Sequence, residues 1–309
     1  MSADLVAGER ILRARFGARL AAGFPMATLT TFRIGGPAAL FVEPEDDDDL
    51  AAAGRAVVEA GLPFVVLGKG SNVLVADEGF PGLVLRLGRG FRWAARQRDD
   101  LTAGGAMPLP ALAGIALRHS LAGLEFGVAI PASLGGAVRM NAGAHGAEMS
   151  DVLRTVDLYR LRLGDRETVG AATLRFAYRS TAVPEDAVVV AATVGLADGD
   201  PAEIRARMDE ARAWRRRTQP LAEPNCGSVF KNPEGDHAAR LIDEAGMKGA
   251  SVGRAHVSEK HANFIVADPG ARAGDVTALI DLVTDRVRER SGVILETEVQ
   301  VLGGVRDAA

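Results

Sequence analysis

Residues 130–149 read IPASLGGAVRMNAGAHGAEM, and this stretch says most about the fold. Its glycines, interleaved with alanine, serine and asparagine, are Gly135, Gly136, Gly143 and Gly146. Ordering so many small residues costs conformational entropy, because glycine loses the most backbone freedom on folding. A backbone pressed against a flat or diphosphate-bearing ligand would justify that cost, and so would close packing of loops.

A second glycine-containing segment is LGKGSNVLVAD at 67–77, in which an apolar run leads into a loop. Successive backbone N–H groups in such a loop can point inward and cradle a phosphate. The segment lacks the four-residue spacer and the following helix of a P-loop, so a tight turn without ligand is the alternative. The chain also has no GxGxxG between a strand and a helix, which argues against a Rossmann nicotinamide domain.

The pattern along the chain predicts three domains. Residues 1–80 alternate strand, helix and strand, with one helix opening at DDDDL (46–50) and a buried strand at 63–68. Residues 81–203 are richer in short β-like runs and predict an α+β domain. Helical spacing returns in 204–309, and the chain closes on a predicted strand, VILETEVQVL at 293–302.

Composition limits the classes of protein that fit. With 309 residues and 48% hydrophobic content, the chain can bury a large core. A net charge of −4 indicates neither a nucleic-acid surface nor a polybasic membrane face. The single cysteine, together with the lack of a signal peptide or a long apolar run, predicts a cytoplasmic protein. The five histidines show no ligand spacing, and we predict no metal site.

Three segments carry side chains that could do chemistry. Arg179 in FAYRST could clamp a carboxylate in bidentate fashion, unless it is a solvated surface arginine. Ser228 in PNCGSVFKNP could donate a proton or act as a nucleophile, unless it is a plain turn serine; we expect the nearby Cys226 to pack as a small apolar residue. Strand alternation in the closing segment places Glu296 and Glu298 on one face, which meets either water or a cleft.

Singly these motifs are weak, but their order is specific. TTFRIGGPA, LGKGSNVLV, IPASLGGAVRMNAGAHG, YRST, GSVFKNP, HANFIV and LETEV follow one another from about residue 28 to 303. This series resembles the UDP-N-acetylenolpyruvoylglucosamine reductase (MurB) family, in its shorter subtype without a tyrosine-bearing loop. The resemblance implies an α+β, vanillyl-alcohol-oxidase-like (PCMH-type) FAD-binding fold in 1–80 and 81–203, followed by a C-terminal α/β substrate domain in 204–309. Ala132 departs from the family pattern, in which glycine is common at that position.

The resemblance also implies ligands and residue roles. NADPH would donate the hydride, and FAD would be bound non-covalently. Arg179, Ser228 and Glu298 would be catalytic, with Ser228 protonating the carbanion left after hydride addition. The candidates for cofactor binding are Arg33, Gly35, Gly68, Lys69, Gly70, Ser71, Asn72, Pro131, Ser133, Gly135, Gly136, Asn141, Gly143 and Gly146. Weaker candidates for binding the UDP-sugar are Arg217, Lys231, Asn232, Lys260, His261 and Asn263.

Two other functions fit parts of the pattern. A flavoprotein oxidase or dehydrogenase of the same fold would ignore UDP-sugars and react quickly with oxygen. A non-catalytic nucleotide-binding module would bind a UDP-sugar without a yellow chromophore. For the favoured reading the partners are UDP-N-acetylglucosamine enolpyruvate and NADPH, without nucleic acid or membrane, and a monomer is favoured.

Overall fold

The computed structural model describes residues 3–304, and their contacts divide into two compact units. The first unit comprises residues up to 22, 39–69 and 82–214. The second comprises 23–38, 70–81 and the chain from 215 onward. Two short segments of the first eighty residues thus group with the C-terminal part. The predicted boundaries at 80/81 and 203/204 stay predictions.

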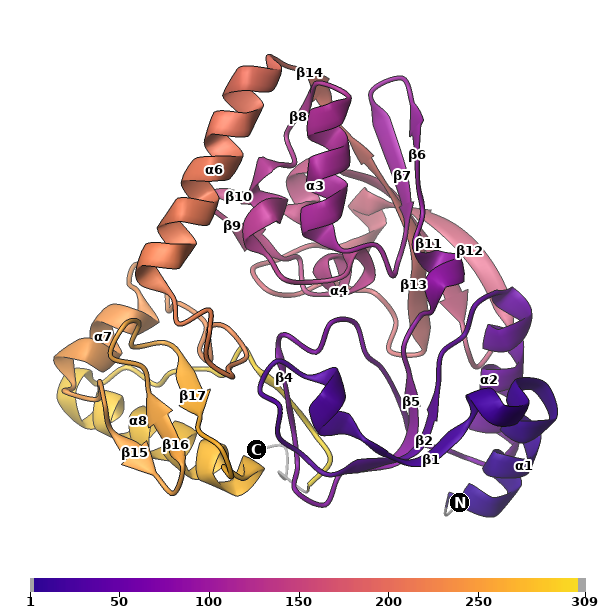
Figure 1. Ribbon diagram of the computed structural model, residues 1–309, viewed down its shortest axis with the longest axis horizontal. Coiled ribbons are helices and arrows are strands. Elements are labelled where there is room, and N and C mark those ends of the chain that lie inside the picture. The colour runs from indigo at the N-terminus through magenta and orange to yellow at the C-terminus, as the bar shows by residue number, and fades with distance from the viewer. Residues whose placement is uncertain (1–2, 305–309) are drawn as a thin grey trace. The chain divides into compact units, whose positions relative to one another are not determined.

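A five-stranded antiparallel sheet forms the centre of the first unit, in the order β12-β11-β13-β7-β6 (Figure 1). Its strands are β6 (Ala94–Gln97), β7 (Asp100–Gly104), β11 (Leu153–Arg160), β12 (Asp165–Gly170) and β13 (Ala187–Gly195). Strand β13 is buried on both faces, and its side chains alternate between two hydrophobic cores. Val189 and Val194 belong to one core, whereas Val188 and Val190 belong to the other. This explains why the strand is an unbroken apolar run.

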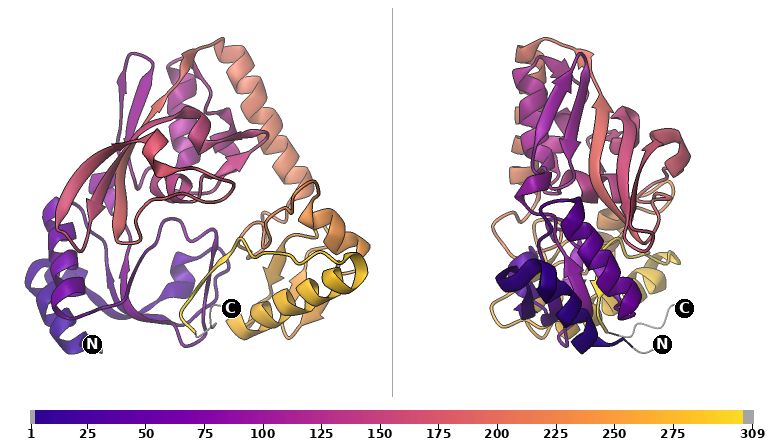
Figure 2. Two further views of the ribbon diagram at one scale, coloured as in Figure 1. Left: turned by 180° about the vertical axis from the view of Figure 1, so that it is seen from behind. Right: turned by 90° about the vertical axis from the view of Figure 1, so that its right-hand side faces the viewer.

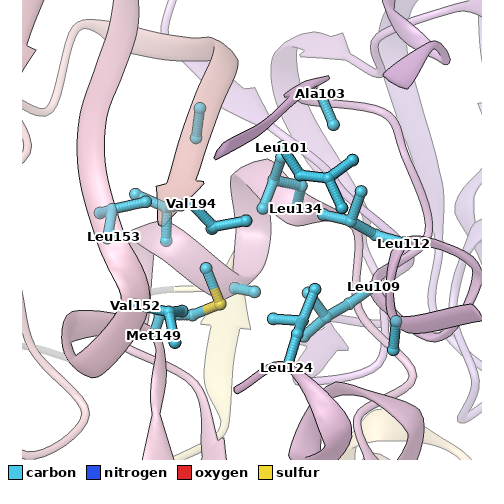
Figure 3. Close-up of a cluster of buried hydrophobic side chains, with 14 of the residues drawn as sticks. Leu101, Ala103, Leu109, Leu112, Leu124, Leu134, Met149, Val152, Leu153 and Val194 are labelled. Atoms are coloured by element: carbon cyan, nitrogen blue, oxygen red, sulfur yellow. The ribbon is translucent and has the colours of Figure 1, made fainter. Parts of the chain in front are cut away.

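Helices cover the core that contains Val194. Figure 3 shows Leu101, Leu109, Leu134 and Met149 converging with it in this cluster. The helices are α3 (Leu109–Arg118), α4 (Leu134–Arg139), α5 (Met149–Val152) and α6 (Pro201–Thr218). Helix α6 contributes Ile204, Met208 and Ala211, the three residues whose spacing predicted it. Two small antiparallel pairs accompany them: β8 (Leu121–Ala122) with β14 (Ala197–Asp198), and β9 (Gly143–Ala144) with β10 (Ala147–Glu148).

The other core of the first unit is packed by α1 (Leu5–Phe16) and α2 (Asp47–Glu59), which lie side by side in Figures 1 and 2. Three aspartates in the first turn of α2 suit the positive end of the helix dipole. A four-stranded sheet in the order β1-β2-β5-β3 accompanies them, and β3 and β5 run parallel. Its strands are β1 (Ala21–Pro25), β2 (Pro37–Val42), β3 (Phe64–Val66) and β5 (Phe80–Leu85). The predicted strand at 63–68 is therefore confirmed, although it is shorter.

The second unit contains a three-stranded antiparallel sheet with α8 across one face (Figure 2). These elements are α7 (Ala238–Glu244), β15 (Ser251–Val252), β16 (Ala255–Val257), β17 (Ile265–Ala267) and α8 (Ala273–Ser291). Helix α8 ends at Gly292, whose φ of 76° allows the left-handed cap. Strand β4 (Val73–Val75) pairs in parallel with β18 (Gln300–Leu302). No helix within 3–304 is long and apolar enough to span a membrane.

The prediction of one strand over 293–302 is wrong for its first seven residues. Regular strand structure begins at Gln300, and the preceding chain has only an isolated bridge between Thr297 and Phe230. The alternation nevertheless found the buried positions Leu295 and Val299. An extended chain alternates its side chains whether or not a neighbouring strand pairs with it, so the pattern could not distinguish the two.

Candidate active site

Arg179 lies at the tip of a tight turn in the first unit. Ala177 and Ser180 exchange both backbone hydrogen bonds, each 3.0 Å long, and leave Tyr178 and Arg179 at the corner. Arg179 has a φ of 56°, a conformation that costs a non-glycine residue roughly 1–3 kcal/mol. Its guanidinium lies 4.9 Å from the centroid of the Tyr178 ring and donates to the carbonyl of Gly143 at 3.3 Å. The strained turn therefore holds a cation at a defined place.

The carboxamide of Asn141 is hydrogen-bonded to this turn. Asn141 is completely buried, and its Nδ2 donates to the carbonyl of Ala177 at 3.2 Å and to Glu148 Oε1 at 2.8 Å. Its Oδ1 accepts the N–H of Ser150 at 3.0 Å. In addition, the Thr181 hydroxyl donates to the carbonyl of Arg139 at 3.0 Å. The side chain of Asn141, a predicted cofactor-binding residue, is thus hydrogen-bonded to the loop that carries Arg179.

Two of the glycine-containing segments meet within the first unit. A Cβ on Gly68 would lie 2.5 Å from Ser133 Oγ, so only glycine permits this approach. The Ser133 hydroxyl in turn accepts the N–H of Gly136 at 3.3 Å at the start of α4. A Cβ on Gly136 would meet only that hydroxyl, at 3.3 Å, whereas one on Gly135 would meet the carbonyl oxygens of Val189 and Gly105. Packing on the sheet therefore explains Gly135, whereas a side chain at Gly136 would press only against the Ser133 hydroxyl.

The second unit contains the other part of the segment at 67–77. The N–H of Thr31 donates to the carbonyl of Gly70 at 3.0 Å. Gly70 has a φ of 60°, and a Cβ there would lie 2.1 Å from the Leu29 carbonyl oxygen. Among residues 3–304, the Thr30 hydroxyl is the buried side-chain polar atom that lacks a hydrogen-bond partner. Such an orphan is costly unless a ligand satisfies it, and it fits a cofactor rich in polar atoms.

Ser228 and Glu298 lie on adjacent, hydrogen-bonded segments of the second unit. The N–H of Glu298 donates to the carbonyl of Val229 at 2.7 Å, and the next residue, Phe230, bridges to Thr297. On the far side, Asn72 Nδ2 donates to the Glu298 carbonyl at 3.0 Å. The sequence places these residues seventy positions apart, and the fold brings two of the three predicted catalytic residues together.

Two titratable groups near this segment keep their neutral forms. Burial, and then the charge of Glu298, raises the pKa of the Cys226 thiol well above its usual range. Cys226 is buried in the hydrophobic core of the unit, as expected of a small apolar residue. Burial, and then the charge of Lys248, lowers the pKa of His261 below 6.5. The N–H of Asn263 donates to His261 Nδ1 at 3.3 Å, which fixes the neutral tautomer with its proton on Nε2.

Several predicted substrate-binding side chains already have partners inside the second unit. Lys231 pairs with Glu296 at 3.1 Å, and Lys260 Nζ donates to the Arg216 carbonyl at 2.7 Å. Asn232 Oδ1 accepts the N–H of Ala238 at 3.1 Å. Asn263 is buried, and both of its amide atoms bond to Phe230. The two amides therefore shape the backbone, and their predicted contact with the UDP-sugar is untested.

Comparison with known proteins covers most of the chain. Residues 219–302 match the model of the UDP-N-acetylenolpyruvoylglucosamine reductase C-terminal domain, and residues 38–170 match an FAD-binding domain. A UDP-N-acetylenolpyruvoylglucosamine reductase of Heliobacterium modesticaldum is 50% identical over 90% of this chain and 89% of its own length. One from Nitrobacter hamburgensis is 41% identical over 98% of this chain and 99% of its own length. The chain belongs to the UDP-N-acetylenolpyruvoylglucosamine reductase family.

A solved member of this family has the same fold. The UDP-N-acetylenolpyruvylglucosamine reductase (MurB) of Thermus caldophilus superimposes with a TM-score of 0.79 at 37% identity, over 92% of this chain and 98% of that one. A more distant likeness in fold is found with Phl p 4.0202, a glucose dehydrogenase, at a TM-score of 0.50 and 15% identity, over 69% of this chain and 51% of that one. The predicted family and the PCMH-type FAD-binding fold with a C-terminal domain are confirmed, and the chain is an FAD-dependent reductase of the MurB family.

The residue roles within this reductase remain predictions, and the structure adds candidates that the motifs did not single out. Thr30, with its orphan hydroxyl, is one of them. The structure also shows what the motifs did not indicate for Asn141 and Asn263, namely that their side chains bond to the backbone. An isolated amide in an apolar run such as HANFIV does carry a signal, because a buried polar group must be hydrogen-bonded. The identity of its partner cannot be obtained from one sequence.

Proposed function

We propose that this chain reduces UDP-N-acetylglucosamine enolpyruvate to UDP-N-acetylmuramate with NADPH, in the synthesis of peptidoglycan precursor. Its membership of the MurB family supports the reaction. The observation that supports the residue roles is the 2.7 Å bond from the Glu298 N–H to the carbonyl of Val229, the residue that follows Ser228. We also propose that the enzyme acts in the cytoplasm, because its single cysteine is free and fits a reducing compartment, and that it acts as a monomer.

When bound, FAD carries the hydride that NADPH supplies. In the first unit, Gly68, Ser133 and Gly136 would hold it, since the close approach of two glycine-containing loops suits a flat dinucleotide. The match of residues 38–170 to an FAD-binding domain supports this assignment.

The three predicted catalytic residues suit the charge that develops on the substrate. Hydride addition to the methylene carbon leaves a carbanion beside the carboxylate, and its charge spreads as an enolate. A preorganised cation lowers the energy of such a charge. Arg179 can supply this cation, since its turn fixes the guanidinium before the substrate arrives.

Ser228 completes the reduction by donating its hydroxyl proton to the carbon next to the carboxylate. Hydride and proton form two C–H bonds, the π bond of the enolpyruvyl group breaks, and every σ bond of the UDP-sugar is kept. A serine hydroxyl is a weak acid, so this transfer requires assistance. Glu298, on the adjacent segment, would assist through a hydrogen bond and help to return a proton to Ser228.

Substitution of Ser228 by Ala tests these roles because the two half-reactions use the site differently. In anaerobic stopped-flow experiments, flavin reduction by NADPH should keep its rate, since it needs no proton from this hydroxyl. Flavin reoxidation by the enolpyruvyl UDP-sugar should slow by about 10²–10⁴-fold, the usual contribution of a general acid. Ser291→Ala, which removes a hydroxyl from the end of α8, should change neither rate. Equal slowing of both half-reactions would make Ser228 structural, and no slowing would place the proton donor elsewhere.

A further inference from the structure

Asn263 binds the backbone of the Ser228 segment as a neighbouring strand would. Its Oδ1 accepts the N–H of Phe230 at 2.9 Å, and its Nδ2 donates to the carbonyl of the same residue at 2.8 Å. Its own carbonyl accepts the N–H of Val229 at 2.9 Å. Asn263 is only 4% exposed, so no water replaces these bonds easily. One residue thus satisfies three backbone groups directly after Ser228.

The opposite edge of the same two residues bonds to the chain that carries Glu298. Val229 offers its carbonyl to the N–H of Glu298, and Phe230 bridges to Thr297. Asn72 then closes the layer, because its Nδ2 donates to the Glu298 carbonyl and its carbonyl accepts the N–H of Gln300 at 3.0 Å. The segment after Ser228 is therefore the middle of a layer, and the side chain of Asn263 forms one of its edges.

The bonds at the two edges differ in how replaceable they are. On the Glu298 side, further backbone bonds continue the pairing, including the Lys231 N–H to the Glu296 carbonyl at 2.9 Å. On the other side, Phe230 depends on the carboxamide of Asn263 alone for both of its backbone groups. The residue before Ser228 is Gly227, whose φ of 80° marks a turn and whose N–H donates to Asn225 Oδ1 at 2.9 Å. Without this carboxamide, the segment would keep on this side only the bond from the Val229 N–H to the backbone carbonyl of residue 263.

We propose that Asn263 is a positioning residue, whose carboxamide keeps the Ser228 hydroxyl in register with Glu298 for proton transfer. This inference rests on the proposed function, since it assigns Asn263 an effect that passes through Ser228. It differs from the expectation that Asn263 contacts the UDP-sugar, and it rests on the bonds from both of its amide atoms to Phe230 and on the burial of the side chain. A displacement of even about 1 Å in a reacting group can cost 10²-fold in rate.

The test is a double-mutant cycle read in the two half-reactions. Asn263→Ala should leave flavin reduction by NADPH unchanged and slow reoxidation by the enolpyruvyl UDP-sugar by about 10–100-fold. The KM for the UDP-sugar should change by less than about threefold, since the side chain does not touch it. In a Ser228→Ala background, the same substitution should cost less than about twofold, because the hydroxyl that it positions is already gone.

The controls separate positioning from general destabilisation. Val283→Ala, a truncation in the hydrophobic core of the same unit, should lower the melting temperature and leave both half-reactions unchanged. Should Asn263→Ala not fold, Asn263→Asp serves instead, since it has the same shape and can still accept from the Phe230 N–H. Additive slowing in the double variant, or a large rise in KM, would overturn the proposal. A Ser228→Ala enzyme that reoxidises normally would instead refute the proposed role of Ser228.

Discussion

Two asparagines are buried among the residues that the structure describes, and each holds a segment that carries a predicted catalytic residue. Asn141, in the first unit, bonds to Ala177, Glu148 and Ser150, three separate partners around the Arg179 turn. Asn263, in the second, bonds with its whole carboxamide to a single residue. The Asn141 side chain links three residues around a strained turn, whereas the Asn263 side chain bonds to the backbone of one extended residue.

The difference follows from the backbone that each asparagine supports. A turn with a positive φ at Arg179 returns to a relaxed conformation unless several contacts oppose it. The chain at Val229 and Phe230 is extended and already paired along one edge, so two bonds on the other edge are enough. Asn141 should therefore contribute more to stability, and Asn263 more narrowly to one chemical step.

Replacement of Asn141 by Ala should produce the largest loss of stability among the changes considered next. It leaves the Ser150 N–H unsatisfied and removes a bond to the Glu148 carboxylate, which together cost about 3 kcal/mol of unfolding free energy. Urea unfolding followed by circular dichroism measures this loss. Thr181→Val is the matched control, because it removes one neutral bond at 3.0 Å and a weak one at 3.4 Å from the same loop and should cost only about 1 kcal/mol. Equal losses in the two variants would remove the contrast between the asparagines.

A second pair of variants tests whether neighbouring glycines serve different ends. Gly136→Val should weaken FAD binding by about 10–100-fold, equivalent to 1–3 kcal/mol of overpacking, while the apoprotein folds normally. Gly135→Ala should instead leave FAD binding unchanged and cost about 1 kcal/mol of stability, because its Cβ would lie 3.1 Å from the Val189 carbonyl oxygen. Titration of apoprotein with FAD, alongside urea unfolding, distinguishes the two. A Gly136→Val protein that binds FAD as tightly as the unaltered chain would remove that segment from the cofactor site.

Much of this arrangement follows from local sequence, and the rest depends on long-range partners. The helical spacing of Ile204, Met208 and Ala211 predicted α6, since amphipathic periodicity is a local property. The closing segment was predicted as a strand from the same kind of signal, yet 293–299 has no partner strand. Pairing depends on a distant segment, here the short stretch 229–231, which bonds to Glu296 and Glu298 on either side of the bridge between Thr297 and Phe230.

The site shows the same division between local and distant information. Order and wording of the motifs identified the family and singled out Arg179, Ser228 and Glu298 as candidates. The motifs did not show that Asn141 and Asn263 would turn their amides toward the backbone instead of a ligand. An asparagine offers the same donors and acceptors to either, and burial decides between them.

A third buried polar group, Asp49, lies apart from the predicted site residues. It therefore tests whether a change at any buried polar group is enough to slow a half-reaction. Asp49 is 1% exposed, and its carboxylate pairs with Arg15 at 2.6 Å and Arg19 at 2.7 Å between α1 and α2. Burial alone would raise its pKa, but hydrogen bonds from Arg19, the Glu45 N–H and Arg15 outweigh this and lower the pKa from 3.8 to about 2.

Because the folded pKa of Asp49 is below the unfolded one, the unfolded chain binds the proton more readily in this range. The stabilisation is therefore complete above about pH 5, and roughly 2 kcal/mol of it is lost as the pH falls to 2. Asp49→Asn cannot titrate, so the difference in unfolding free energy between it and the unaltered chain should shrink by that amount over this interval. Urea unfolding at several pH values measures it. Both half-reactions at neutral pH should keep their rates in Asp49→Asn; a selective loss of flavin reoxidation there would mean that any buried polar cluster affects the step assigned to Ser228.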